Sequence, residues 1–261
     1  MLMSYETIRV TKEEGIAIIT LNRPPMNPLN SAVFTEIAQA ADEFAKDNSV
    51  KVVIITSTGG KAFAAGADVS EMVTLTPVEA YGFCQGSRAA FSKLENLNKP
   101  VIAAITGVAF GGGVELALAA DFRIAADNAK FAFPETGLGI IPGGGGTQRL
   151  PRLIGAAKTK ELMFTGDIID AAEALKIGLV NQVVTLDSIM EETLKFAKRL
   201  ALKPFVAIQM AKAAISHGAD IDINTGLEME IQNFVIAFAS ADGREGISAF
   251  VEKRKPNYTD K

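Results

Sequence analysis

Short β-branched segments alternate with helical patterns along the first 185 residues of the chain, and only helical patterns follow them. This order predicts an α/β core, because alternating strands and helices must cover one another's apolar faces. The all-helical remainder predicts a packing or assembly module. We expect strands at residues 16–21, 52–56, 101–105, 122–126, 130–133 and 178–184.

Capping signals mark the start of two of the predicted helices. Ser31 can cap a helix that runs through about residue 47. Thr76 followed by Pro77 suits the start of a long helix through about residue 97, because proline is well tolerated at the first helical position. Further helices are expected at residues 113–120, 156–165, 171–177, 188–202, 205–216 and 225–241.

The charge balance and the apolar pattern exclude several classes of protein. The 261 residues carry 26 Lys and Arg against 30 Asp and Glu, a formal net charge of −4. Such a chain has no basic field to attract nucleic acid or an anionic membrane surface. Residues 1–9 lack the apolar segment of a secretory signal, and no run of about eighteen apolar residues occurs. We therefore expect a soluble, cytoplasmic protein that binds neither nucleic acid nor membrane.

Cysteine and histidine are too few for several kinds of site. Cys84 is the only cysteine, which excludes an internal disulfide, and we expect it to be a small packing residue. His217 is the only histidine, so a zinc site of the His/Cys type is excluded. A Ser-His-Asp or Cys-His site would need His217 as its base. Because His217 ends an apolar helical stretch beside Gly218, we expect it at the surface or in a helix cap.

A run of three glycines followed by an acid is the most informative feature for function. Residues 111–113 are glycines after a predicted strand, and Glu115 falls in the first turn of the helix that comes next. Glycines let a backbone approach a ligand closely, and a helix start offers unpaired N–H groups to an oxygen that gains negative charge. The alternative is a helix-capping glutamate beside a glycine turn that serves packing.

A second acid, Glu135, comes 20 residues later at the end of a short predicted strand. It precedes a glycine-rich loop at residues 137–146, which must fold into a tight backbone structure. Two acids near one glycine-lined cavity could form an acid/base pair. The alternative is a surface glutamate after the turn at Pro134.

Small residues at positions 64–67 leave room for a ligand after the predicted strand at 52–56, and Asp68 follows them. The alternative is a tight loop in which Asp68 caps a helix. No nucleotide-binding motif competes with these candidates. The glycines at 143–146 lack the following Lys-Ser/Thr of a P-loop and the strand context of a dinucleotide-binding fingerprint.

Five motifs together resemble the signature of the crotonase family in order and in spacing. They are Asn22-Arg23-Pro24, the segment from Phe63 to Asp68, Lys99 to Ala104 leading to Gly111–Leu116, Pro134-Glu135 with Gly139–Leu150, and the ending from Ala249 to Lys255. The resemblance covers almost the whole chain.

The resemblance implies a crotonase-like spiral of ββα repeats over residues 1–195 and a C-terminal helical oligomerisation region over residues 196–261. It implies enoyl-CoA hydratase activity, the reversible addition of water to 2-enoyl-CoA, as in fatty acid metabolism and β-oxidation. It also implies a homo-oligomer, either a trimer or a dimer of trimers. Coenzyme A enters as part of the acyl-CoA substrate, and we expect neither a metal nor a separate cofactor.

Residue by residue, the resemblance places the chemistry at named positions. Glu115 and Glu135 match the two catalytic acids, and the presence of both points to a hydratase. Ala67 and Gly112 match the residues whose amides form the oxyanion hole. The matching CoA contacts are Ala65, Asp68, Val69 and Ser70 in one loop, and Phe234 and Lys253 near the C-terminus, in part across subunits. Ser70 stands where close relatives often carry lysine, so one phosphate contact is missing or supplied elsewhere.

Three alternatives stay open on the sequence. The first is another acyl-CoA reaction of the crotonase family, such as enoyl-CoA isomerisation or CoA-ester hydrolysis, and an isomerase would leave Glu115 idle. An RNA-binding protein of the same fold would want a lysine-rich helix face, and neighbouring glutamates dilute the cluster of Lys195, Lys198, Arg199 and Lys203. The third alternative is a non-catalytic assembly protein. The acyl chain length, the pathway and the choice between trimer and hexamer are not determined by the sequence.

Overall fold

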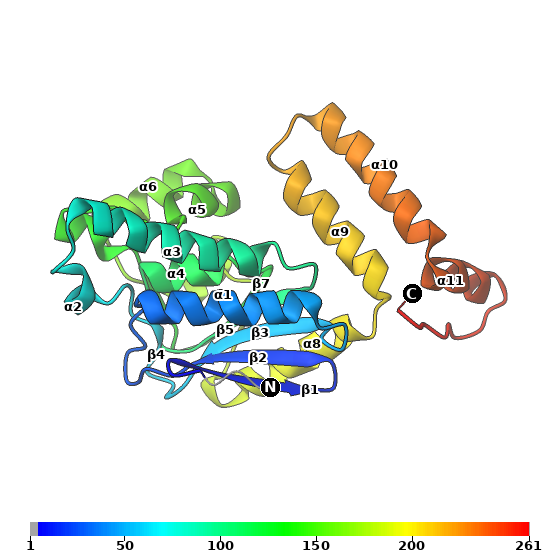
Figure 1. The fold of residues 1–261 in the computed structure, drawn as a ribbon, viewed down its shortest axis with the longest axis horizontal. Coiled ribbons are helices and arrows are strands. Elements are labelled where there is room, and N and C mark those ends of the chain that lie inside the picture. Colours follow the sequence, from blue (N-terminus) through cyan, green and yellow to red (C-terminus); the bar gives the residue numbers. More distant parts are fainter. Residues whose placement is uncertain (1–4, 261) are drawn as a thin grey trace.

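The structure of the protein is a computed structural model that describes residues 5–260. Its larger sheet has six strands in the order β1-β2-β3-β5-β7-β10 (Figure 1). β1 pairs with β2 in antiparallel orientation, and the other neighbours are parallel. The strands are β1 Ile8–Glu13, β2 Ile16–Leu21, β3 Val52–Ser57, β5 Val101–Ile105, β7 Phe122–Ala126 and β10 Gln182–Val184.

A second sheet has four short strands in the order β4-β6-β8-β9. β4, β6 and β8 are parallel to one another, and β9 pairs with β8 in antiparallel orientation. The strands are β4 Ala62–Ala64, β6 Val108–Phe110, β8 Lys130–Ala132 and β9 Ile169–Asp170.

Between residues 52 and 165 the chain repeats one structural unit three times. Each unit sends one strand to the larger sheet and one to the smaller sheet, and then forms helices. The helices are α2 Val69–Met72 and α3 Pro77–Glu95 in the first unit, α4 Gly112–Leu118 in the second, and η1 Pro134–Leu138, α5 Gly146–Ile154 and α6 Ala156–Thr165 in the third. This ββα repeat confirms the predicted α/β spiral.

Helices cover both faces of the larger sheet. Val53 and Ile55 of β3 pack in one apolar cluster with α1 (Ser31–Lys46), and Ile54 packs in a second cluster with α8 (Ile189–Ala201). Successive strand residues point to opposite faces, so the continuous apolar run of β3 is buried on both sides. Figure 1 shows α1 and α3 side by side above the larger sheet.

The local sequence signals place most element boundaries, and two predictions are wrong. Thr76 caps α3 as predicted, in a capping box with Glu79. The cap of α1 is Asn30 rather than Ser31, since the side chain of Asn30 accepts a hydrogen bond of 3.0 Å from the amide of Val33. The last strand begins at residue 182 rather than 178, because the chain first turns after α7 (Ala171–Lys176) through Gly178, whose φ is +79°.

Elements not predicted are β1, β4, β6, β9, η1, η2 Leu186–Ser188, α2, α5 and α11 Ala241–Val251.

The C-terminal helices extend away from the two sheets. α9 (Phe205–Gly218) and α10 (Ile223–Ala239) form a helical hairpin, and α11 follows at the right of Figure 1. Lys212 of α9 joins the hairpin to the core, because its Nζ donates to Asp121 at 2.8 Å and to the carbonyl of Lys99 at 2.9 Å.

The predicted domain boundary between residues 195 and 196 stays a prediction, and α8 runs across it against the sheet. None of the helices within residues 5–260 combines the length and apolar character needed to span a bilayer.

Candidate active site

Glu115 lies in the first turn of α4 and is almost completely buried, with 4 % of its surface exposed. Its Oε1 atom accepts hydrogen bonds from the amides of Gly144 (2.9 Å) and Gly146 (2.7 Å) in the glycine-rich loop. Burial raises the pKa of Glu115, while these amides and the charge of Arg149 act in the opposite direction. The loop therefore holds the carboxyl group of Glu115 in place through Oε1 rather than through Oε2.

Glu135 lies in η1 and is also buried. Its Oε2 atom has no hydrogen-bond partner among the described residues. Burial raises the pKa of Glu135 to about 7, and the negative charge of Glu115 contributes to the shift. A carboxyl group with this pKa can hold or release a proton near neutral pH.

The glycine run at residues 111–113 brings the two acids into one site. Gly111 has φ +47°, and its carbonyl accepts the amide hydrogen of Glu115 at 3.0 Å. On its other side, Gly111 lies against the carboxyl group of Glu135. A Cβ atom on Gly113 would lie 2.1 Å from the carbonyl oxygen of Ala64, so only glycine lets α4 pack this closely on β4.

Ala67 and Gly112 are neighbours in space although 45 positions separate them in the sequence. A Cβ atom on Gly112 would lie 3.5 Å from the backbone nitrogen of Ala67. Ala67 forms a β-bridge with Leu29. In this bridge the amide of Leu29 donates to the carbonyl of Gly66 at 2.9 Å, and the amide of Asp68 donates to the carbonyl of Leu29 at 2.8 Å. The Ala67 amide is not used by this bridge. Gly112 is the first residue of α4, where an amide has no partner within the helix.

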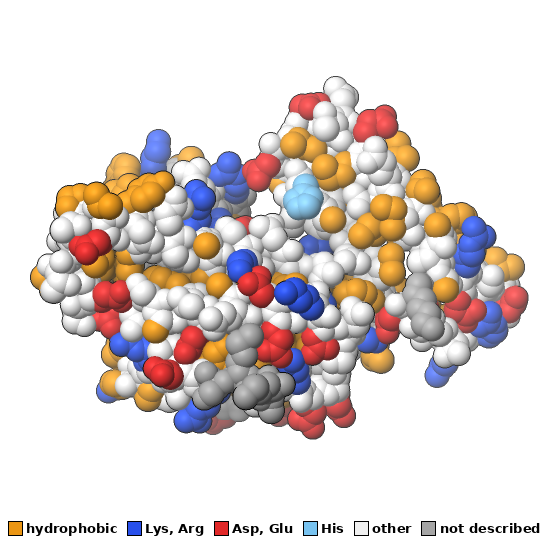
Figure 2. Space-filling model, in the orientation of Figure 1, with side chains coloured by type: hydrophobic (Ala, Val, Ile, Leu, Met, Phe, Trp, Pro, Cys, Tyr) orange, Lys and Arg blue, Asp and Glu red, His pale blue; other side chains and the backbone are white. Residues whose placement is uncertain are grey.

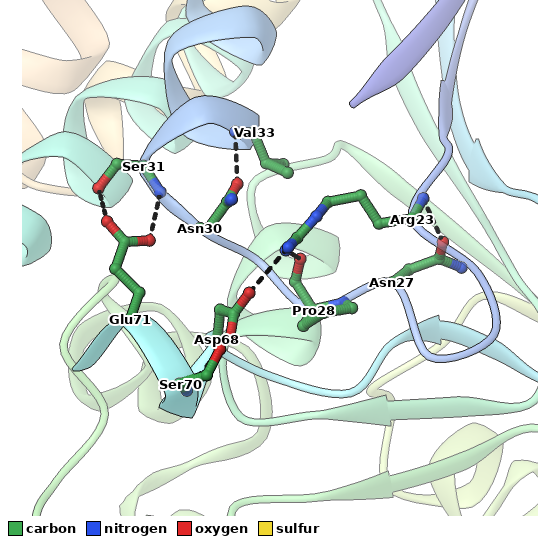
Figure 3. Close-up of polar contacts among 9 residues, drawn as sticks. All are labelled: Arg23, Asn27, Pro28, Asn30, Ser31, Val33, Asp68, Ser70 and Glu71. Carbon is green, nitrogen blue, oxygen red and sulfur yellow. Dashed lines mark hydrogen bonds and ion pairs between the residues drawn. The ribbon is translucent and has the colours of Figure 1, made fainter. Parts of the chain in front are cut away.

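The loop after β4 is tied to the segment before α1 by polar contacts (Figure 3). Asp68 accepts a hydrogen bond from Arg23 Nη2 at 2.9 Å, and it caps α2 by accepting the amide hydrogen of Ser70 at 3.2 Å. The hydroxyl of Ser70 and the guanidinium of Arg23 lower the pKa of Asp68. Arg23 also donates to the carbonyl of Pro28 at 2.6 Å. The capping alternative for Asp68 is thus confirmed, and its contact with CoA stays a prediction.

The predicted CoA contacts fall into two groups. Ala65 is half-buried, and Val69 and Ser70 are exposed on α2, so all three lie in the loop region next to Ala67. Phe234 lies on α10 with 65 % of its surface exposed, and Lys253 is exposed just after α11. Figure 1 shows α10 and α11 well separated from α2, so a single chain does not bring these two groups together.

Arg149 is a residue of the site to which the sequence assigned no role. From α5 it reaches the glycine-rich loop, where its Nη1 donates to the carbonyl of Gly144 at 3.0 Å. The only sequence signal for it is its place in the motif at residues 139–150. Cys84 of α3, expected from the sequence to be a packing residue, also lies at the site, because its sulfur lies against Gly143. Burial together with the charge of Glu115 raises the pKa of its thiol. His217 is exposed in the last turn of α9, as predicted.

No group of three or more His, Cys, Asp or Glu side chains within residues 5–260 is arranged to hold a metal ion. A groove of about 610 Å³ lies between α1 and α3, and neither Glu115 nor Glu135 lines it. The site brings together two buried carboxyl groups and the amides of Ala67 and Gly112, which have no backbone hydrogen-bond partner among the described residues.

Comparison with known proteins identifies the family of the chain. Residues 11–261 match the family described as enoyl-CoA hydratase/isomerase. The chain is 46 % identical over 260 residues to crotonyl-CoA hydratase of Syntrophomonas wolfei, an alignment that covers 99 % of this chain and 100 % of the relative. It is 43 % identical to short-chain-enoyl-CoA hydratase of Clostridium acetobutylicum, with 97 % of each chain covered. Among solved structures, enoyl-CoA hydratase from Bacillus anthracis superposes with a TM-score of 0.94 at 41 % identity, covering 98 % of this chain and 100 % of that chain.

Proposed function

Because the chain belongs to the enoyl-CoA hydratase/isomerase family, we propose that it adds water to the double bond of a 2-enoyl-CoA to give 3-hydroxyacyl-CoA. The observation that carries the proposal is the pair of buried acids around Gly111. Glu115 is fixed by two amides, and Oε2 of Glu135 has no hydrogen-bond partner within the part of the chain that the structure describes. The relatives named for crotonyl-CoA and short-chain enoyl-CoA support a short acyl group.

The free amides of Ala67 and Gly112 would receive the thioester oxygen. Addition of water at C3 moves electron density onto this oxygen, and two fixed N–H donors stabilise the enolate that forms. Each donor in such a hole contributes about 2.7–4 kcal/mol in other enzymes. The start of α4 adds a positive dipole end at the same place.

The environments of the two acids suggest a division of labour. Two amide donors favour the carboxylate form of Glu115, which suits it to take a proton from water as the oxygen bonds to C3. Glu135, with a pKa of about 7, is partly protonated at neutral pH and can deliver a proton to C2. One turnover leaves the proton on Glu115 and the charge on Glu135, so a proton must return before the next turnover.

We further propose that the chain works as a trimer or a dimer of trimers. No residue of α9 or α10 is buried, although both helices are rich in apolar side chains. Ile231, Phe234 and Phe238 of α10 and Phe250 of α11 are all exposed, and Figure 2 shows apolar side chains across this part of the surface. So much exposed apolar surface on a helical hairpin is typical of an interface, and other copies of the chain would bury it. In such an assembly, Phe234 and Lys253 could reach the CoA bound by a neighbour.

Crotonyl-CoA provides the direct test. Addition of the pure protein should abolish the absorbance of the conjugated thioester and yield 3-hydroxybutyryl-CoA. Conversion of a 3-enoyl-CoA to the 2-enoyl form without hydration would support the isomerase alternative instead. The RNA-binding alternative is weakened because two of the four basic residues in the cluster form ion pairs, Lys198 with Glu14 at 2.7 Å and Lys195 with Glu192 at 3.6 Å.

A further inference from the structure

The position of Glu115 depends on a loop that has little regular structure of its own. The loop supplies both amides that bind Oε1 of Glu115, from Gly144 and Gly146. Between them, Gly145 has φ +116°, a left-handed conformation that glycine adopts without strain. A small rotation of either peptide would withdraw its N–H from the carboxyl group. Something outside the loop must therefore fix the orientation of these peptides.

Arg149 contacts the Gly144–Gly145 peptide, which lies between the two donating peptides. Its Nη1 donates to the carbonyl of Gly144 at 3.0 Å, at the peptide that follows the first donating amide. The opposite edge of the Arg149 guanidinium makes a bidentate contact with Glu95 of α3. Nε donates to Oε1 at 3.0 Å, and Nη2 donates to Oε2 at 2.7 Å. Nη2 also donates to the hydroxyl of Ser92 at 3.3 Å. A planar guanidinium held at two edges is a rigid support, which a flexible ammonium group is not.

The guanidinium lies directly against the loop. A Cβ atom on Gly145 would stand 2.1 Å from Nη1 of Arg149, so no side chain fits between them. The side chain of Arg149 is largely buried, and its cation is close enough to Glu115 to favour the charged form of that carboxyl group. Arg149 thus acts on Glu115 by two routes, through the loop geometry and through charge.

We propose that Arg149, held by Glu95, is a positioning residue for the hydration reaction. It holds the Gly144–Gly145 peptide in its orientation, so that the amides of Gly144 and Gly146 stay on Oε1 of Glu115. The second carboxyl oxygen of Glu115 then stays directed toward the attacking water. The inference rests on the proposed function, because it assigns Arg149 to the acid that activates water. It adds a link from α3 through α5 to the catalytic carboxyl group.

The chain offers a matched control on the same helix. Arg152 of α5 also forms an ion pair, with Asp220 at 3.1 Å, but both side chains are more than half exposed. It has no contact with the glycine-rich loop among the hydrogen bonds of residues 5–260. Arg152→Met therefore removes the same charge from the same helix without touching the support of Glu115.

Steady-state kinetics on crotonyl-CoA tests the proposal in the assembled enzyme. Arg149→Met should lower kcat by roughly 10- to 100-fold, the effect expected when a charged hydrogen bond that positions a catalytic group is lost. KM should change by no more than about twofold, since no CoA contact is removed. Arg149→Lys keeps the charge and should recover part of kcat, and Glu95→Gln should lower kcat by a smaller factor. Arg152→Met should match the native enzyme.

The pH profile separates positioning from a general loss of structure. The charged or titratable groups around Glu115 are Glu135 from η1, Arg149 from α5 and Cys84 from α3. Loss of the Arg149 cation should raise the pKa of Glu115 further, so the acid limb of kcat/KM should move to higher pH in Arg149→Met. In Arg149→Lys the limb should stay near its native position while kcat falls.

Several results would overturn the inference. Native-like kcat in Arg149→Met, or an equal loss in Arg152→Met, would remove Arg149 from this role. A loss that only follows the folded fraction, with an unchanged pH profile, would do the same. If Arg149→Met does not fold, Arg149→Lys and Glu95→Gln decide the question by their kcat. A native protein that does not hydrate crotonyl-CoA would instead refute the proposed function itself.

Discussion

Gly111 leaves the space that the carboxyl group of Glu135 occupies: a Cβ atom on Gly111 would stand 2.5 Å from Oε1 of Glu135. Gly111 also has φ +47°, where a residue with a side chain is strained. The same glycine accepts the amide hydrogen of Glu115 through its carbonyl. One backbone position therefore contacts both acidic residues and sets the conformation of the chain that enters α4.

Gly111→Ala should displace Glu135 and lower kcat on crotonyl-CoA by about a hundredfold, because a misplacement of about 1 Å has an effect of this size. The matched control is Gly82→Ala, on an exposed face of α3 where a Cβ atom would meet nothing within 4 Å. This variant should stay active and gain about 0.5–1 kcal/mol of stability, since alanine is the better helix former. Near-native turnover in Gly111→Ala would show that Glu135 needs no fixed position.

Gly112→Pro tests the amide proposed for the oxyanion hole. Proline fits the first position of a helix but has no N–H, so the substitution removes the donor with little harm to α4. We expect kcat to fall by a factor of about 10²–10³, as for the loss of a donor in other oxyanion holes. Gly112→Ala keeps the N–H, and the three nearest atoms to its Cβ would lie at ordinary contact distances of 3.4–3.7 Å, so it should lose much less activity. Equal losses in both variants would assign the effect to shape rather than to the donor.

Glutamine at position 115 or 135 keeps the shape of each acid and removes its proton transfer. Each single variant should lower kcat by roughly 10²–10⁴, the range for a positioned acid or base. The double variant should be little worse than the poorer single variant, because both groups act in one addition step. Binding of crotonyl-CoA, measured by calorimetry, should survive in all three. Hydration by Glu115→Gln at near the native rate would leave the single-acid isomerase as the better assignment.

The raised pKa of Glu135 predicts a dependence of stability on pH. The folded protein holds this proton up to about pH 7, whereas the unfolded chain releases it near its ordinary value of 4.5. Between these values the native state binds more protons, so the free energy of unfolding falls as pH rises. Glu135→Gln removes this loss and should be more stable than the native protein by about 1–3 kcal/mol at pH 8, with no gain at pH 4.5. Urea unfolding at a fixed protein concentration measures the difference, and a gain that is the same at both pH values would contradict it.

The exposed apolar side chains of α10 and α11 predict the state of assembly. Light scattering at micromolar concentration should give the mass of a trimer or a hexamer. Phe250→Asp, at a side chain that is 86 % exposed, should shift the mass toward the monomer, because a charge at an apolar interface is unfavourable. Tyr81→Asp alters another exposed aromatic residue, on α3, and is the control for a surface change elsewhere. A native monomer would contradict the proposed assembly.

The sequence determined those parts of the fold that local patterns encode. The short run of β-branched residues at 52–56 favours a buried strand, and Thr76-Pro77 favours the start of a helix; the structure confirms both predictions. The short strands β4 and β6 escaped prediction because three residues show no period. The motif order also indicated which acids and amides belong to one site.

Only the tertiary structure decided how those residues meet. Glu115 and Glu135 share a site because the second and third ββα units stack, an event that no local pattern records. The amides that bind Glu115 and the arginine that holds them come from a third segment, at Gly144–Arg149. Their roles depend on peptide orientation and on a fork to Glu95, which is distant in the sequence. Residue types and spacing can state which groups are present, but a pKa near 7 on Glu135 follows from burial and a neighbouring charge, and those exist only once the chain is packed.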